Sequence, residues 1–299
     1  MIDNLLLVQE RTALALPRGR FPKLSNIDYF ANTEPYESCV GGDHWSIVNF
    51  QDYNLDEKIE DAKRVAGETG NYALVDRLKK NRESFGIIIC DVLGHGIPSS
   101  IIASNLHIAL KVGISYELRV NGEITSGLFE LLNTLFYNHI ESEHIRDKPY
   151  ATMLYGEIHN DGRFRFLSAG HPPPSVFSNE FNRIVKLSDE YRRASTPLGV
   201  LPSRYHVDIE HFESVASTKD KYSVNEINLL GRGDILLLYT DGLSEQDNGR
   251  RNFFDERLEF VLREAKSESA KNIYNAIRTE LYKFCPPSDD VTVAVIKKV

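Results

Sequence analysis

Aspartates at the ends of apolar segments are the residues of this chain best suited to chemistry. Asp91 ends the apolar run FGIIIC, and Asp241 closely follows the run ILLLY. A continuous apolar run of this length is typical of a strand buried on both faces. A carboxylate at its tip is a fixed anion where a ligand can approach. Similar positions beside glycine, proline or another acid are occupied by Asp43, Asp289 and Asp290.

Strand pairing would bring these acids together. If residues 43–50 and 85–91 form an antiparallel hairpin, Asp43 lies opposite Asp91, because residues whose numbers sum to about 134 face each other. The same geometry for residues 235–241 and 289–296 brings Asp241 to the acids at 289 and 290. Two such sheets stacked face to face, about 10 Å apart, would pool the carboxylates around one or two hard cations.

An all-oxygen ligand set favours Mg²⁺ or Mn²⁺ over Zn²⁺. Two such ions about 4 Å apart can activate a shared water and clamp a phosphate oxygen. This chemistry suits phosphoester hydrolysis without a protein nucleophile. The alternative is that the acids belong to separate strand-end turns, where aspartate is common.

Periodicity and turn signals outline the elements that would position the acids. The Asn160-Asp161-Gly162 sequence predicts a hairpin turn between two strands. We expect further strands at 26–31, 151–158, 164–169, 206–211 and 235–239, a hairpin within 176–187, and helices at 97–114, 124–140, 254–265 and 270–284.

Three segments are less clearly structural. The charge-rich insert 51–84 should leave the hairpin at the end away from Asp43 and Asp91, so we expect a solvated helical decoration or a docking element, not a lid. Residues 213–228 are polar and predict a surface loop. Residues 1–20 predict an amphipathic leader helix that packs into the core or forms a helical contact in a homodimer.

Composition restricts the class of protein. A formal net charge of −8 argues against an extended groove for nucleic acid. No apolar run approaches the roughly 18 residues that span a bilayer, and the N-terminus lacks a signal-peptide pattern. The three widely spaced cysteines form no CxxC motif. These features predict a cytoplasmic protein without membrane or nucleic-acid partners.

An ordered set of motifs makes the chain recognisable. It resembles the SpoIIE-like phosphatases, the bacterial branch of the PPM-type metal-dependent serine/threonine protein phosphatases, from about Asp28 to the C-terminus. We therefore expect one phosphatase domain over residues 21–299, after the leader helix. The motifs are GGDHW at 41–45, DVLGHGIPSS at 91–100, SAGHPPP at 168–174, PLGV at 197–200, GDILLLYTDGLSE at 233–245 and DDVTVAVI at 289–296.

The resemblance implies an α+β fold, an αββα sandwich of two stacked antiparallel sheets flanked by helices. It also implies a centre of two Mn²⁺ or Mg²⁺ ions and, by motif matching, assigns a role to each acid. Asp43 would bridge the ions, Asp91 and the Val92 carbonyl would hold one, and Asp241 and Asp289 the other. Asp290 is the less favoured alternative to Asp289.

Two histidines stand in the motifs. His95 either protonates the leaving serine oxygen, which a pKa near 6.5 would suit, or is a turn residue whose ring bonds the backbone. We expect His171 to order its proline-rich loop. The chain departs from the family in having Ser46 where an acid is frequent, and no arginine or lysine stands in a motif as a phosphate clamp.

The resemblance also implies a substrate and a pathway. The expected substrate is phosphoserine or phosphothreonine on a STAS-domain anti-sigma-factor antagonist, in partner switching controlled by a separate activator protein. One alternative is a PPM-fold scaffold that binds a phosphoprotein with little turnover. Another is a small-molecule phosphoesterase. No P-loop motif is present, which excludes a P-loop enzyme.

Overall fold

The computed structural model describes residues 22–36, 41–94, 97–139, 150–188, 195–203, 219–228 and 231–299. The predicted leader helix, the predicted strand at 206–211 and His95 therefore lie outside the described residues. None of the helices within these ranges is both long enough and apolar enough to span a lipid bilayer.

Two five-stranded antiparallel sheets form the centre of the described structure. The first sheet has the order β2 (His44–Val48), β3 (Ser84–Val92), β4 (Ala151–His159), β5 (Phe164–Ala169) and β8 (Val224–Ile227). The second has the order β1 (Ile27–Glu34), β10 (Val291–Lys298), β9 (Ile235–Tyr239), β6 (Ser175–Ser178) and β7 (Arg183–Val185).

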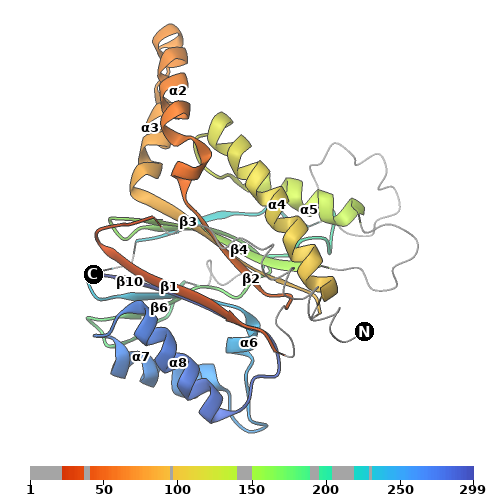
Figure 1. Cartoon of the computed structure of the whole chain (residues 1–299), viewed down its shortest axis with the longest axis vertical. Coiled ribbons are helices and arrows are strands. Elements are labelled where there is room, and N and C mark those ends of the chain that lie inside the picture. The colour runs from red at the N-terminus through yellow and green to blue at the C-terminus, as the bar shows by residue number, and fades with distance from the viewer. Residues whose placement is uncertain are drawn as a thin grey trace, which may run out of the picture.

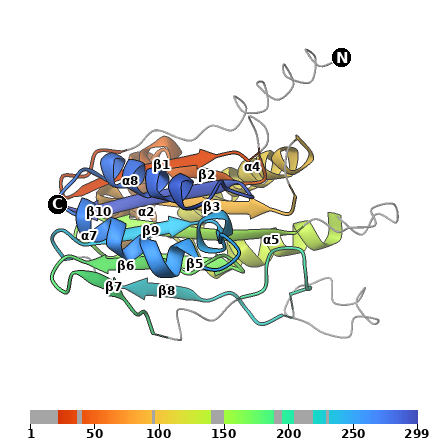
Figure 2. The same cartoon turned by 90° about the horizontal axis from the view of Figure 1, so that it is seen from below.

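Helices cover the outer face of each sheet, so the predicted αββα sandwich is confirmed (Figure 1). The first sheet is covered by α4 (Ile97–Val120) and α5 (Ser126–His139), and the second by α7 (Glu259–Ala265) and α8 (Ala270–Phe284). Figure 2 shows the two helices near the C-terminus, labelled α7 and α8, lying across the sheet that contains β1, β10, β9 and β6. A π-helical turn at Phe254–Leu258 leads into α7.

Side chains of β3 alternate between two cores, which explains why residues 85–90 of the strand are all apolar. Phe85, Ile87 and Ile89 belong to the core between the two sheets, whereas Ile88 and Cys90 belong to the core beneath α4 and α5. Both faces of the strand are thus buried, and polar residues have no place along it. The acid appears only where the strand reaches the edge of the sandwich.

The predicted register between the first two strands is confirmed. His44 pairs with Cys90 and Val48 pairs with Gly86, so the residue numbers of each pair sum as expected. The second pairing is confirmed too, because β9 and β10 are antiparallel neighbours, with Tyr239 opposite Val293. Both pairings direct their acids to the same end of the sandwich.

The insert contains α2 (Leu55–Thr69) and α3 (Ala73–Lys80), which rise beyond the sheets as a separate hairpin (Figure 1). It joins the two strands at their Val48 and Ser84 ends, away from the acids, as predicted. One face of each helix is nevertheless buried in the core that also contains α4 and α5. The insert is therefore more than a solvated decoration at its base.

The expectation of a surface loop throughout residues 213–228 is wrong at its C-terminal end. Residues Val224–Ile227 form β8, the edge strand beside β5, with Val224 opposite Leu167 and Ile227 opposite Phe164. Of its four residues only Ile227 is fully buried. An edge strand with so little buried surface lacks the apolar signal on which a sequence prediction depends.

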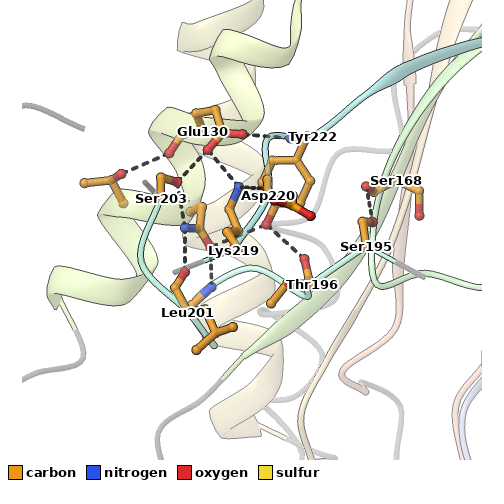
Figure 3. A network of polar contacts seen from close by, with 12 residues as sticks. Glu130, Ser168, Ser195, Thr196, Leu201, Ser203, Lys219, Asp220 and Tyr222 are labelled. Atoms are coloured by element: carbon orange, nitrogen blue, oxygen red, sulfur yellow. Dashed lines mark hydrogen bonds and ion pairs between the residues drawn. The ribbon is translucent and has the colours of Figure 1, made fainter. Parts of the chain in front are cut away.

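A buried polar network fixes two loop segments to α5 (Figure 3). The Glu130 carboxylate accepts hydrogen bonds from Ser203 Oγ (2.5 Å), Lys219 Nζ (2.8 Å) and the Tyr222 amide (2.8 Å). The Tyr222 hydroxyl donates to the Thr196 carbonyl at 3.0 Å. These contacts hold residues 195–203 and 219–222 against the helix.

Candidate metal centre

Asp43 lies where the two sheets meet at one edge of the sandwich. It immediately precedes β2 of the first sheet and is 7% exposed. Its Oδ2 accepts hydrogen bonds from the hydroxyls of Thr240 (2.7 Å) and Thr292 (2.8 Å), which belong to the second sheet's side of the site. The carboxylate therefore ties the two sheets together.

The two glycines before Asp43 are required by close packing. A Cβ on Gly41 would lie 1.8 Å from the Asp290 Oδ2 atom, and a Cβ on Gly42 would lie 2.3 Å from the Val92 carbonyl oxygen. Neither space admits a side chain. The GGD motif thus has a steric explanation: it lets the loop carrying the acid pass between two neighbouring segments.

The adjacent acids 289 and 290 are placed very differently. Asp290 is 4% exposed, and its carboxylate accepts hydrogen bonds from the amides of Tyr36 (2.7 Å) and Gly42 (2.8 Å). Asp289 is exposed, and its Oδ1 accepts from the Asp290 amide at 2.8 Å. The buried acid therefore supports the loop before Asp43, whereas the exposed acid faces solvent.

Asp241 opens the short helix α6 (Asp241–Ser244) directly after β9. The next residue, Gly242, packs so closely on the Asp290 carbonyl that a Cβ would lie 2.0 Å from that oxygen. This contact places the start of α6 against the segment that contains Asp289 and Asp290. The structure thus brings the predicted acids of both sheets to one edge.

These carboxylates oppose one another's ionisation. Burial raises the pKa of Asp43 well above its usual range, and the charge of Asp91 raises it further, against the lowering effect of the two threonine hydroxyls. Burial and the charges of Asp241, Asp289 and Asp290 raise the pKa of Asp91 to about 7. Burial, followed by the Asp289 charge, raises the pKa of Asp241.

The carboxylates lie near one another but do not yet surround a position for a cation. Among the described residues, no three histidine, cysteine, aspartate or glutamate side chains form a ready-made cation site. The donor chemistry does fit a hard divalent cation, because the crowded groups are all carboxylates and oppose one another's ionisation. A bound cation would remove that opposition.

The positions of Val92 and His171 bear less directly on their predicted roles. Val92 is buried, and its carbonyl oxygen lies beside Gly42, so its role as a metal ligand stays a prediction. His171 is buried with Nδ1 2.9 Å from Thr152 Oγ1, and burial lowers its pKa to about 3. A neutral ring held beside Thr152, which pairs with Asp91, supports a structural role.

The sequence reasoning did not identify Thr240 and Thr292 as site residues. Thr240 stands beside Asp241 in YTDG, Thr292 stands two residues after Asp290 in DDVT, and both side chains are fully buried. A buried hydroxyl needs a hydrogen-bond partner, so a threonine next to an acid at a strand end was an available signal. Which acid would accept the hydrogen bond depends on the stacking of the sheets.

The site and the layered fold together define a PPM-type, or PP2C-type, architecture. The family model described as Stage II sporulation protein E (SpoIIE) matches residues 81–299, and the chain belongs to this family.

Two curated relatives come from Bacillus subtilis (strain 168). The phosphoserine phosphatase RsbU is 24% identical over 243 residues, which cover 79% of this chain and 61% of RsbU. The phosphoserine phosphatase RsbP is 30% identical over 201 residues, which cover 67% of this chain and 41% of RsbP. The chain therefore matches less than two thirds of the length of either relative.

A solved structure supports the fold. The SiaA-PP2C domain of Pseudomonas aeruginosa superposes with a TM-score of 0.62 at 17% sequence identity, and the match covers 99% of this chain and 95% of that domain. The similarity in structure extends over nearly the whole chain, although the sequences have diverged widely.

Proposed function

We propose that this protein is a metal-dependent protein serine/threonine phosphatase. The observation that carries the proposal is the gathering of Asp43, Asp91, Asp241 and Asp289 from both sheets at one edge, where their charges oppose one another. Membership of the SpoIIE family and similarity to two phosphoserine phosphatases support the same reaction.

Mn²⁺ or Mg²⁺ ions, when bound, would supply an activated water and charge stabilisation for the phosphoryl group. Asp91 interacts with Asp43 and with the acids on the second sheet's side, which supports its proposed role as a ligand of one ion. Asp43 uses Oδ2 for two threonines, so its predicted bridging role would depend on Oδ1. Asp241 and Asp289 would complete the ligand set, while Asp290 supports the loop before Asp43. His95 remains a proposed general acid.

The proposed substrate is phosphoserine or phosphothreonine on a STAS-type protein, in a cytoplasmic partner-switching pathway. Dephosphorylation would remove a charge of about −1.5 to −2 from the substrate's interface. This proposal rests on the relatives' named activity on phosphoserine. A charge change of this size is sufficient to alter which partner a small protein binds.

A partner surface for a separate activator, or for a second copy of the chain, is supported by α4. Apolar side chains are exposed at intervals along this helix, and two more are exposed on α5. They are Ile101, Ile108, Val112, Tyr116 and Val120, with Leu131 and Leu135. An apolar stripe of this extent on a surface helix is typical of an interaction site. A homodimer through the predicted leader helix stays a prediction.

Phosphatase assays with metal substitution test the proposal. We expect Mn²⁺-dependent hydrolysis of a phosphoserine protein that EDTA abolishes. Asp91→Asn and Asp241→Asn should each lower kcat/KM by about a hundredfold or more, because several kcal/mol of charge stabilisation depend on the ions. Asp61→Asn, an exposed acid on α2, is the matched control.

Each alternative gives a different result. Turnover that survives EDTA and both site substitutions would refute the metal mechanism. Turnover of aryl phosphate but of no phosphoprotein would indicate a small-molecule phosphoesterase. Tight binding of a phosphoprotein without turnover would indicate a scaffold.

A further inference from the structure

A hairpin with two arginines extends from the segment that follows α6. Residues 247–252, here called the arginine hairpin, close through a bridge between Asp247 and Asn252. The Asn248 side chain accepts hydrogen bonds from the amides of Arg250 and Arg251, both at 3.2 Å. The tip is therefore organised by its own backbone contacts before any ligand arrives.

The base of the arginine hairpin is tied to both segments that carry the proposed metal ligands. Asn252 Nδ2 donates to the Ser244 carbonyl at the end of α6 (2.7 Å), the helix that Asp241 opens. The buried Gln246 side chain donates to the Pro286 carbonyl (2.9 Å) and accepts from the Ser288 amide (3.3 Å), just before Asp289. The hairpin is thus anchored to the segments that carry Asp241 and Asp289.

An open pocket of about 530 Å³ lies under the hairpin and carries an excess of positive charge. Two acids stand against four cations in its lining, in a protein whose formal net charge is −8. The charged lining residues are Arg250, Arg251, Arg257, Lys283, Glu256 and Glu280.

The cations are not all neutralised by these acids. Glu280 is shared by Arg257 (3.0 Å) and Lys283 (2.7 Å), and Glu256 pairs with Arg251 at 3.3 Å. Among the residues that the structure describes, the Arg250 side chain has no ion pair or hydrogen bond. The carboxylate of the nearby Asp247 accepts from the Gly249 amide and stabilises the turn. Arginine binds carboxylates through paired donors, so this pocket fits acidic side chains.

We propose that the pocket beneath the arginine hairpin docks an acidic segment of the phosphoprotein substrate, a run of aspartates or glutamates close to the phosphorylated residue. The inference rests on the proposed phosphatase function and adds a determinant of substrate choice. Because the backbone of the hairpin is already ordered by its internal hydrogen bonds, that backbone loses little conformational entropy when the segment binds. Electrostatic recognition of this kind also makes association dependent on salt.

Two phosphoserine peptides that differ only in flanking charge test the proposal. One carries four glutamates beside the phosphoserine and the other carries four glutamines, with versions that place the run on either side. We expect the wild-type kcat/KM to favour the acidic peptide by about three- to tenfold, the effect of two exposed ion pairs. The double variant Arg250→Gln/Arg251→Gln should reduce this ratio to about one, whereas the control Arg64→Gln on α2 should retain it.

A binding measurement separates this inference from the proposed reaction. Fluorescence anisotropy with a labelled, unphosphorylated four-glutamate peptide requires no turnover, and we expect its affinity to fall with added salt and in the double variant. A substrate ratio and affinity that the double variant leaves unchanged would overturn the docking site. A wild-type protein that binds the acidic peptide through these arginines but hydrolyses no phosphoserine would contradict the phosphatase proposal alone.

Discussion

At the scale of single residues, neighbouring acids have separate tasks. The Asp290 carboxylate binds backbone amides of the loop before Asp43, while Asp289 is exposed and accepts a hydrogen bond from the Asp290 amide. A motif of two consecutive aspartates therefore combines a support and a proposed ligand.

A matched pair of substitutions distinguishes these tasks. Asp290→Asn should lower the free energy of unfolding of the metal-free protein by about 2 kcal/mol, because an amide cannot accept on both sides and a buried backbone N–H loses its partner. Asp289→Asn at an exposed position should change it by less than about 0.5 kcal/mol. Urea denaturation in EDTA measures both, and equal effects would contradict the assignment.

The sequence predicted that the acids would meet, because the numbers of paired residues in an antiparallel hairpin have a constant sum. The assumed antiparallel hairpin of β2 and β3, in which the numbers of paired residues sum to about 134, placed Asp43 opposite Asp91 correctly. The support given by Asp290 was not predictable in the same way, since it joins backbone groups far apart in the chain and leaves no local pattern. Thr240 and Thr292 were missed because their partner depends on how the sheets stack.

At the scale of elements, the Glu130 network controls how a long loop region meets the sandwich. Burial raises the pKa of Glu130, but the hydrogen bonds from Lys219 and Ser203 outweigh it and leave that pKa below its usual range. Residues 195–203, held by this network, pair through Leu198 with Ala151, which is the partner of Val92 in the sheet. The network thus connects α5 with the strand beside the proposed metal centre.

Removing one partner of the ion pair between Glu130 and Lys219 should destabilise the protein. Glu130→Ala leaves the Lys219 ammonium, whose side chain is 1% exposed, without its carboxylate, and should lower the free energy of unfolding by about 3 to 5 kcal/mol. The double variant Glu130→Gln/Lys219→Met should recover a large part of that loss. The exposed pair Asp61–Arg64 is the control, where Asp61→Ala should cost at most about 1 kcal/mol. Denaturant unfolding at pH 7 gives the comparison, and a double variant no more stable than Glu130→Ala would argue against coupling between Glu130 and Lys219.

At the scale of the whole molecule, the edge of the sandwich that gathers the acids lowers the stability of the metal-free fold, although the proposed function requires it. Acids from both sheets are held close together although their charges repel. A carboxyl group whose pKa is raised by folding binds its proton more tightly in the folded state. Its ionisation at higher pH therefore lowers stability.

This repulsion gives the metal-free protein a defined pH dependence. For Asp91 the folded-state pKa of about 7 lies above the ordinary value of 3.8, so stability should fall as pH rises between these values. Asp91→Asn removes the ionisation. The free energy of unfolding of metal-free Asp91→Asn should exceed that of the wild type. The difference should grow from near zero at pH 4 to at most about 4 kcal/mol above pH 7.

Urea denaturation in EDTA at several pH values tests this expectation, with Asp61→Asn as the control. A difference between Asp91→Asn and wild type that does not change with pH would contradict it. In the presence of Mn²⁺ the order should reverse, because the ion stabilises only the protein that retains its ligand.

The seam between the two sheets also contains the protein's single tryptophan. Trp45 lies two residues after Asp43 and is 4% exposed in the core that both sheets share. Its emission therefore comes from one environment, next to the edge where the carboxylates gather. Any event that loosens the stacked sheets or alters that edge can be followed optically in the unmodified chain, without a label and without a second fluorophore of the same kind to obscure it.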